Sequence, residues 1–202
     1  MVCGCSSKVH AERVVTVLVV GAAGGGKSTL LKLLGRRFAR KSEPAETGVP
    51  TTRPTIGVEI ENVSAPSARV MLQEVGGCMT LMWPRTFAGV RELSSLALDA
   101  RPPPAGYYEA CAAIVYVVDA ANAASLAEAW VELLFLLDDR NCAEKAVTVV
   151  LNKGDLGEDV GPVKQFLRLE ALAPRVTVLE GSVTEGGALV DAVRGVLLDA
   201  AR

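Results

Sequence analysis

Residues 14–28 read VVTVLVVGAAGGGKS, and this stretch decides the fold. Its first seven residues are mostly apolar and β-branched, which is typical of a strand buried in a parallel sheet. The next eight match every fixed position of the pattern G-x-x-x-x-G-K-[ST], as Gly21-Ala22-Ala23-Gly24-Gly25-Gly26-Lys27-Ser28. The stretch therefore predicts a strand, a phosphate-binding loop and a helix, in the order that this pattern requires.

The chemistry of this loop is that of a polyphosphate site. Glycines let the backbone wrap closely around phosphate groups, so that N–H groups and the helix N-terminus face the charge. Lys27 is expected to reach the β- and γ-phosphates, and the Ser28 hydroxyl to ligate Mg²⁺. We count Thr29 with the nucleotide-binding residues. The alternative is a glycine-rich turn that only tightens the link between strand and helix.

The rest of the chain repeats the alternation of strands and helices. Three further runs are apolar on both faces, as expected of buried strands: Ile114–Val118, Val147–Leu151 and Val176–Leu179. Apolar residues at helical spacing occupy Lys27–Arg40, Ser125–Leu137 and Ala188–Ala201. This order predicts an α/β fold, a doubly wound and mostly parallel sheet with helices on both faces.

Three other segments complete the expected organisation. Val58–Val63 and Arg69–Gln73 alternate in polarity and predict an antiparallel hairpin at a sheet edge. Lys41–Thr52 has the composition of a mobile loop. Residues 84–106 are expected to be an insertion, with a short helix near residues 90–98, because the segment is too short for a core of its own. We expect a flexible tail at 1–13 and one domain at 14–202.

Composition excludes several classes of function. The formal net charge of −2 gives no long-range attraction to nucleic acid, so we expect no nucleic-acid partner. Five scattered cysteines indicate a reducing compartment rather than a disulfide framework. The only histidine, His10, lies near the terminus, which excludes a Ser-His or Cys-His pair in the domain. No signal peptide is visible. We expect a soluble, cytoplasmic protein, with association with a membrane or the cilium left open.

A second motif, Asn152-Lys153-Gly154-Asp155, directly follows a predicted buried strand. Ligands of such sheets bind at the carboxyl ends of strands, so this loop should share a rim with the phosphate loop. A carboxylate at Asp155 can accept from the N1–H and the N2 amine of guanine, and adenine offers no such pair of donors. The motif therefore predicts a guanine site. The alternative is an ordinary polar turn after a strand.

Three further loops complete the predicted site. Thr55, before the hairpin, is placed to bind Mg²⁺ through its hydroxyl and the γ-phosphate through its N–H, which would make an order–disorder switch. At the other end of the hairpin, Glu74 is placed for a water in the Mg²⁺ shell and the Gly77 N–H for the γ-phosphate. In Gly181-Ser182-Val183-Thr184, Ser182 and Val183 are expected to close over the base.

Together these motifs resemble those of the small GTPases, and among them the ADP-ribosylation-factor-like (Arf-like) branch. The branch signals are Pro54-Thr55-Ile56-Gly57, Val75-Gly76-Gly77 and the length of the hairpin between them. The strings TRPTIG and EVGGCM, with Trp83, are most similar to a divergent Arf-like subfamily that has Cys where Gln is usual. The resemblance covers the chain from Val14 onward, apart from the insertion. It implies a six-stranded G domain that binds GTP and GDP and recruits effectors when loaded with GTP.

The resemblance also implies partners and a cellular role. Arf-like proteins act with effectors, an exchange factor and an activating protein in membrane traffic and ciliary transport. This chain departs from the family at Val2, which excludes N-myristoylation, and at Ala23 and Glu74, where the family has Asp. It also departs in the base-closing loop, at Val183 and Thr184. Cys3 and Cys5 offer a reversible palmitoylation site, and two inert thiols in a tail are the alternative.

Cys78 raises the question of turnover. The family's glutamine at this position orients the attacking water. A thiol is shorter and a poor hydrogen-bonding group, so we expect weak catalysis from Cys78, with Lys27 and Thr55 as the other catalytic residues. The alternative role for Cys78 is packing beneath the insertion. Two other classes of function stay open: a phosphate-loop kinase or ATPase, and an interaction module that binds nucleotide without turnover.

Overall fold

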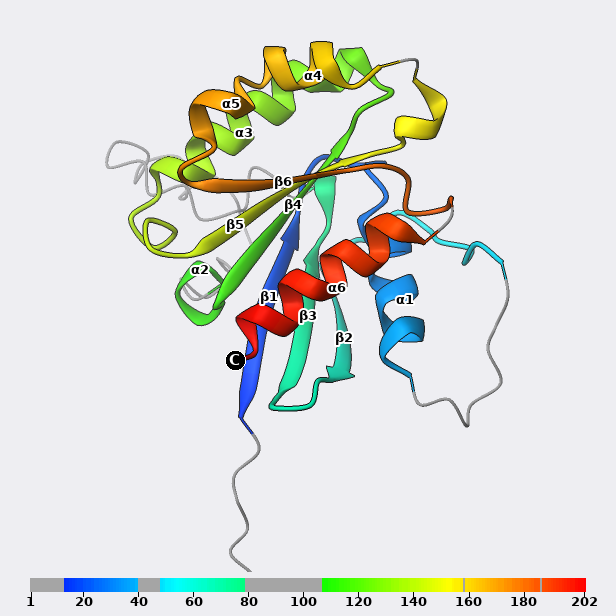
Figure 1. Cartoon of the computed structure of the whole chain (residues 1–202), viewed down its shortest axis with the longest axis vertical. Helices are drawn as coiled ribbons and strands as arrows, with labels where there is room; N and C mark the ends of the chain where they lie inside the picture. The colour runs from blue at the N-terminus through cyan, green and yellow to red at the C-terminus, as the bar shows by residue number, and fades with distance from the viewer. Residues whose placement is uncertain (1–12, 40–47, 79–106, 158, 186) are drawn as a thin grey trace, which may run out of the picture.

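The computed structural model describes residues 13–39, 48–78, 107–157, 159–185 and 187–202 (Figure 1). Its strands form one six-stranded sheet in the order β2-β3-β1-β4-β5-β6. Every neighbouring pair is parallel except the antiparallel pair of β2 and β3. The strand bounds are β1 Val14–Val20, β2 Val58–Ser64, β3 Arg69–Val75, β4 Ala113–Asp119, β5 Ala146–Asn152 and β6 Val176–Glu180. The predicted fold class and the edge hairpin are confirmed.

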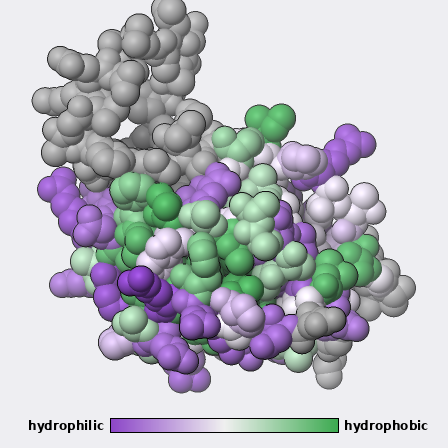
Figure 2. All heavy atoms as spheres, turned by 90° about the horizontal axis from the view of Figure 1, so that it is seen from above, coloured by the Kyte–Doolittle hydropathy of each residue, from purple (hydrophilic) through white to green (hydrophobic). Residues whose placement is uncertain are grey.

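Helices cover both faces of the sheet (Figure 1). One face carries α1 and α6, which contact each other, and the other carries α3, α4 and α5. Figure 2 looks onto the end of the molecule that is uppermost in Figure 1 and shows hydrophobic surface gathered over its middle. The bounds are α1 Lys27–Phe38, α2 Tyr107–Ala110, η3 Ala123–Ser125, α3 Leu126–Asp138, η4 Gly154–Leu156, α4 Gly161–Phe166, α5 Leu169–Leu172 and α6 Ala188–Ala200.

The central strands are buried on both faces because their side chains belong to two separate hydrophobic cores, one on each face of the sheet. In β4, Ile114 and Tyr116 join the core under α3, while Val115 and Val117 join the core under α1 and α6. Successive side chains of a strand point to opposite faces, so a strand between two helical layers must be apolar at every position. A continuous apolar run is therefore what a strand at the centre of the sheet requires.

The last strand differs from its prediction. Val176–Leu179 was expected to be buried on both faces, and this is wrong for β6: Thr177 and Glu180 are exposed, and Val178 is only half-buried. The reason is that β6 pairs only with β5 and forms an edge of the sheet. An apolar run alone does not distinguish an edge strand from a central one.

Helix boundaries follow local backbone geometry. The first helix ends at Phe38 rather than Arg40, where the Ala39 N–H donates to the Gly35 carbonyl. Helices α4 and α5 were not predicted, because each is short and the left-handed residue Arg168 (φ 47°) separates them. Residues 1–12 of the expected tail, the expected insertion at 84–106 with its short helix, and residues 41–47 of the expected loop lie outside the described residues.

Among the residues that the structure describes, no helix is both long enough and apolar enough to cross a membrane.

The two residues that follow α6 are hydrogen-bonded to the end of the sheet where β1 begins. Arg13 donates to the Arg202 carbonyl oxygen at 2.8 Å, and the Ser67 hydroxyl, in the hairpin turn, donates to the Ala201 carbonyl oxygen at 3.0 Å. These two side chains therefore hold the residues after α6 against the start of β1 and the hairpin turn.

We predict that the buried Tyr116 hydroxyl stabilises the core under α3. It donates to the Ala129 carbonyl at 2.9 Å and to Glu132 Oε2 at 3.1 Å. Tyr116→Phe removes a donor from two buried acceptors and should lower the free energy of unfolding by about 1–3 kcal/mol. Urea unfolding of Tyr116→Phe, Glu132→Gln and the double variant measures this. Additive effects of the two single changes would show that the pair is not coupled.

Candidate functional site

The phosphate loop connects the end of β1 to the start of α1 at the carboxyl edge of the sheet. Gly26 shows why the loop needs a glycine: its φ is 94°, and a β-carbon there would lie 2.3 Å from Asn152 Nδ2. The loop therefore reaches this position only without a side chain, and it lies in direct contact with the loop that follows β5.

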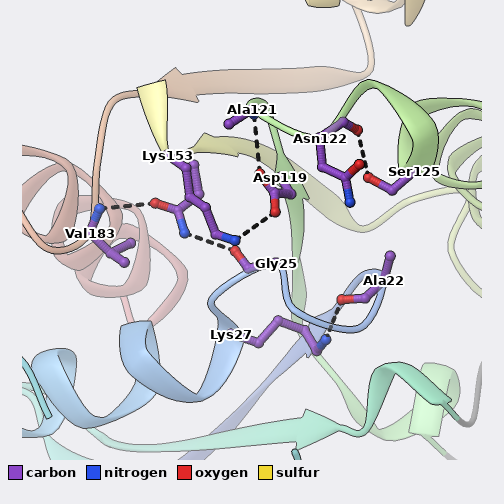
Figure 3. Close-up of polar contacts among 10 residues, drawn as sticks. Ala22, Gly25, Lys27, Asp119, Ala121, Asn122, Ser125, Lys153 and Val183 are labelled. Atoms are coloured by element: carbon purple, nitrogen blue, oxygen red, sulfur yellow. Dashed lines mark hydrogen bonds and ion pairs between the residues drawn. The ribbon is translucent and has the colours of Figure 1, made fainter. Parts of the chain in front are cut away.

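Lys27 is folded under the phosphate loop. Its Nζ donates to the carbonyl oxygens of Gly21 and Ala22, each at 2.8 Å, and the side chain is buried. Figure 3 shows the contact with Ala22. Burial lowers the pKa of the Lys27 amine, and the charges of Glu74 and Glu132 oppose that shift. The amine is thus fixed at the loop that the sequence assigns to the phosphates.

Three oxygen-bearing side chains from separate elements meet beside Lys27. The Ser28 hydroxyl, in the first turn of α1, donates to Glu74 Oε1 at 2.8 Å and lies 3.0 Å from Thr55 Oγ1. Thr55 precedes β2, and Glu74 lies near the end of β3. These are the three residues that the sequence assigns to the metal, and the fold brings them together.

Glu74 is the unusual member of this group. Its side chain is 2% exposed, and Oε2 is buried with no hydrogen-bond partner in the described part of the chain. Burial raises the pKa of the Glu74 carboxyl, and the hydrogen bond from Ser28 and the charge of Lys27 oppose that rise. A buried carboxylate oxygen without a partner, next to two hydroxyls, fits a hard divalent cation such as Mg²⁺, which prefers oxygen ligands.

The segment after β3 runs against the phosphate loop. The Gly76 N–H donates to the Gly57 carbonyl at 2.9 Å, which ties the two ends of the hairpin together. A β-carbon on Gly77 would lie 2.3 Å from the Ala23 nitrogen, so only glycine allows this approach. Cys78 is exposed, and its thiol donates to the Thr55 carbonyl oxygen at 3.7 Å. The predicted γ-phosphate residues thus lie together at the edge of the loop.

The Asn152 side chain, at the end of β5, joins two loops. Its Nδ2 donates to the Gly25 carbonyl at 2.8 Å, and its Oδ1 accepts from the Val183 N–H at 3.0 Å; both contacts are dashed in Figure 3. The residue is 1% exposed. A buried amide that is satisfied at both ends fixes the relative positions of its neighbours. Asn152 therefore holds the phosphate loop and the base-closing loop at one distance.

Lys153 adopts the left-handed conformation (φ 66°), and its ammonium contacts Asp119 Oδ2 at 2.6 Å (Figure 3). Asp119 ends β4, and its Oδ1 accepts from the Ala121 N–H at 3.1 Å. Sequence reasoning missed this residue. The signal was available, because a lone carboxylate at the carboxyl end of a buried parallel strand lies on the rim where ligands bind.

Asp155 lies on the same rim, in η4, with its side chain exposed. The Gly154 N–H donates to the Gly181 carbonyl at 3.0 Å, so this turn is bound to the base-closing loop. In that loop the Ser182 hydroxyl lies 2.9 Å from Thr184 Oγ1. The residues predicted to surround the base therefore come from neighbouring, hydrogen-bonded loops.

Comparison with known proteins places this chain in a family. The model of the ADP-ribosylation factor family matches residues 98–198, half of the 202-residue chain. The chain belongs to the ADP-ribosylation factor family. This Arf-family protein is therefore a small GTPase, a guanine-nucleotide-binding switch that hydrolyses GTP to GDP. The predicted resemblance is confirmed, and the kinase or ATPase alternative is wrong. The role of Cys78 in place of glutamine stays a prediction.

Individual relatives agree with this assignment. Human ADP-ribosylation factor-like protein 16 is 29% identical over 178 residues, 85% of this chain and 79% of the human protein. Drosophila melanogaster ADP-ribosylation factor-like protein 1 is 29% identical over 186 residues, 90% of this chain and 87% of the fly protein. The structure of the Arl6 small GTPase from Trypanosoma brucei, with bound GppNp, has a TM-score of 0.66 at 15% identity. The similarity covers 93% of this chain and 97% of the Arl6 chain, and it supports the same fold.

We predict that Asn152 is required for both nucleotide affinity and stability in this GTPase. Asn152→Ala leaves the Gly25 carbonyl and the Val183 N–H without their buried partner, which should destabilise the fold by about 2 kcal/mol or more. Affinity for a fluorescent GDP should fall roughly tenfold or more, because the loops lose their fixed spacing. Asn62→Ala, the same change at an exposed position on β2, is the control. If Asn152→Ala binds GDP as tightly as the wild type, Asn152 does not hold the two loops in place for the nucleotide.

Proposed function

We propose that this Arf-family GTPase binds GTP with Mg²⁺, senses the third phosphate through Thr55, and hydrolyses GTP slowly unless a partner protein supplies a missing group. The observation that carries the proposal is the meeting of Ser28, Thr55 and Glu74, with Cys78 at the position after the double glycine. The first three have the chemistry of a metal site, and the fourth lacks the chemistry of a water-positioning residue.

The phosphates are bound by this chain's own loop. Residues 21–28 present their N–H groups and the α1 N-terminus to the anion, and Lys27 supplies a charge at the β- and γ-phosphates. Thr29 follows in the first turn of α1. The Gly77 N–H, beside Ala23, completes the group that contacts the third phosphate. These roles rest on the loop motif and on the contacts of Lys27 and Gly77.

Mg²⁺ would be held by the Ser28 and Thr55 hydroxyls, with Glu74 acting through a water. When bound, the cation neutralises charge on the phosphate oxygens. The fit rests on the unpaired, buried Oε2 of Glu74 and on its two hydroxyl neighbours. Glu74 has one methylene more than the family's Asp, and in this fold that length brings its carboxylate to the Ser28 hydroxyl directly.

The guanine base would be recognised by the loop that follows β5. Asp155 accepts two hydrogen bonds from guanine, while Lys153, fixed by Asp119, flanks the base. Ser182 and Val183 close the other side of the site, and Asn152 sets their distance from the phosphate loop.

We expect Asp155→Asn to reverse base preference. The wild type should bind GTP and GDP far more tightly than ATP, because only guanine offers the paired donors that a carboxylate requires. The new amide can donate to the C2 oxygen of xanthine, so Asp155→Asn should favour xanthosine nucleotides over guanosine nucleotides. Competition binding with GTP, ATP and XTP on both proteins measures this. Equal affinity of the wild type for ATP and GTP would contradict the guanine reading of Asp155.

Slow hydrolysis follows from the chemistry of Cys78. Orienting a water for in-line attack requires a side chain that accepts from the water and donates to the transition state. A thiol is short and a weak participant in both roles, and here it is directed to the Thr55 carbonyl. No histidine lies in the described residues to activate the sulfur. A partner's arginine would contribute on the order of 10³–10⁵ in rate.

We expect Cys78→Gln to accelerate single-turnover GTP hydrolysis by the isolated protein, because the amide restores both hydrogen-bonding functions. The matched control is Cys78→Asn, which has the same amide on a side chain one methylene shorter and should gain less. Rates are compared with GTP preloaded and Mg²⁺ in excess. If the wild type already hydrolyses GTP briskly and Cys78→Gln is no faster, another residue positions the water. If neither protein turns GTP over, the interaction-module alternative is favoured.

The GTP-loaded form would act by recruiting effectors. Ile56, next to Thr55, is 91% exposed, and an apolar side chain so placed is available to a protein that reads the position of Thr55. An exchange factor and an activating protein complete the cycle, and the family resemblance supports a role in membrane or ciliary traffic. Acylation of Cys3 and Cys5 would add membrane affinity, and stable anchoring would need both.

A further inference from the structure

Two basic side chains of α1 hold the segment that leads to Thr55. Lys32 Nζ donates to the Thr51 carbonyl oxygen at 3.0 Å, and Arg36 donates from NH1 to the Gly48 carbonyl oxygen at 2.6 Å. Both acceptors belong to the backbone. The two contacts therefore fix the path of the chain and do not depend on which side chains the segment carries.

We propose that Lys32 and Arg36 are positioning residues that hold residues 48–55 along α1 and so place Thr55 beside Ser28. This inference rests on the proposed role of Thr55 as the sensor of the third phosphate. It adds to that role a device, built into α1, that sets the affinity for the triphosphate state alone.

The spacing of the contacts supports the proposal. Ser28, Lys32 and Arg36 follow one another at intervals of four residues, so they form a single stripe on α1, one per turn. Along this stripe they contact Thr55, Thr51 and Gly48 in turn. The segment thus runs antiparallel to the helix, with one polar contact at each turn, and Thr55 is the last point of the series.

Packing of apolar side chains is not what holds residues 48–55 along α1. A cavity of about 450 Å³ lies between α1 and the segment, lined by residues that include Ser28, Lys32, Thr51 and Thr55. Thr51, Arg53, Pro54 and Ile56 are exposed. A segment with few buried apolar side chains is held mainly by its polar contacts, and loss of those contacts lets it take other paths.

Glu61 on β2 lies against α1 and feels the charge of Lys32. Glu61 packs over Gly35, where a β-carbon would lie 2.7 Å from Glu61 Oε1. Burial raises the pKa of the Glu61 carboxyl, and the nearby charge of Lys32 opposes that rise. Lys32 is therefore within electrostatic reach of a carboxyl group on β2, and its hydrogen bond goes to the Thr51 carbonyl oxygen of the segment.

The test compares affinity for a non-hydrolysable GTP analogue with affinity for GDP, both with Mg²⁺. Lys32→Met and Arg36→Met, alone and together, remove the contacts. The double variant should bind the analogue roughly three- to tenfold more weakly, the equivalent of about one net hydrogen bond, while GDP affinity stays within about twofold of wild type. Lys32→Arg keeps a hydrogen-bond donor at this position and should retain the wild-type affinity for the analogue. Hydrogen exchange at residues 49–55 of the analogue complex should be faster in the double variant.

Two controls separate the possible results. Lys145 also donates to a backbone carbonyl oxygen, that of Cys111 at 2.6 Å, but it lies just before β5 and away from Thr55. Lys145→Met should therefore leave both affinities unchanged. Thr55→Ala measures the sensor itself. If Thr55→Ala weakens the analogue selectively and the double variant does not, the positioning role is overturned and the proposed function stands. If Thr55→Ala shows no selectivity, the sensor role fails and the positioning role fails with it.

Discussion

The arrangement of the site depends on one buried amide. Parallel strands deliver their carboxyl ends to the same edge of the sheet, but that alone leaves the loops after them free to diverge. Asn152 removes this freedom by donating to the phosphate loop and accepting from the base-closing loop. Because Gly26 has no side chain, the amide fits directly against the loop. The proposed phosphate and base subsites therefore have a separation that contacts within the fold itself set.

The second organising element is the edge hairpin. Its two strands pair over seven residues, from Val58 opposite Val75 to Ser64 opposite Arg69. Thr55 precedes this ladder of paired residues, and Glu74 lies within it, opposite Glu59. Both reach Ser28, so the hairpin closes a ring of contacts that runs from α1 through both strands and back. A change in one of the two phosphate-facing segments cannot leave the other untouched.

Much of this could be predicted from the sequence, for identifiable reasons. The phosphate loop and Asn152–Asp155 are local motifs placed by their flanking strands, so pattern and topology together locate them. Asp119, Lys32 and Arg36 are different, because their roles depend on which backbone atoms come near in the folded chain. The edge position of β6 was likewise hidden, since an apolar run reveals burial but not the number of neighbouring strands.

The fastening of α6 to the start of β1 has a practical consequence. Arg13 and Arg202 are hydrogen-bonded, and Figure 1 shows the end of α6 beside the beginning of β1, away from the edge that carries the phosphate loop. The two ends of the folded domain thus share one pole. A short peptide bridge between them would span little distance, so a circularly permuted chain, opened elsewhere, is compatible with the nucleotide site as it stands.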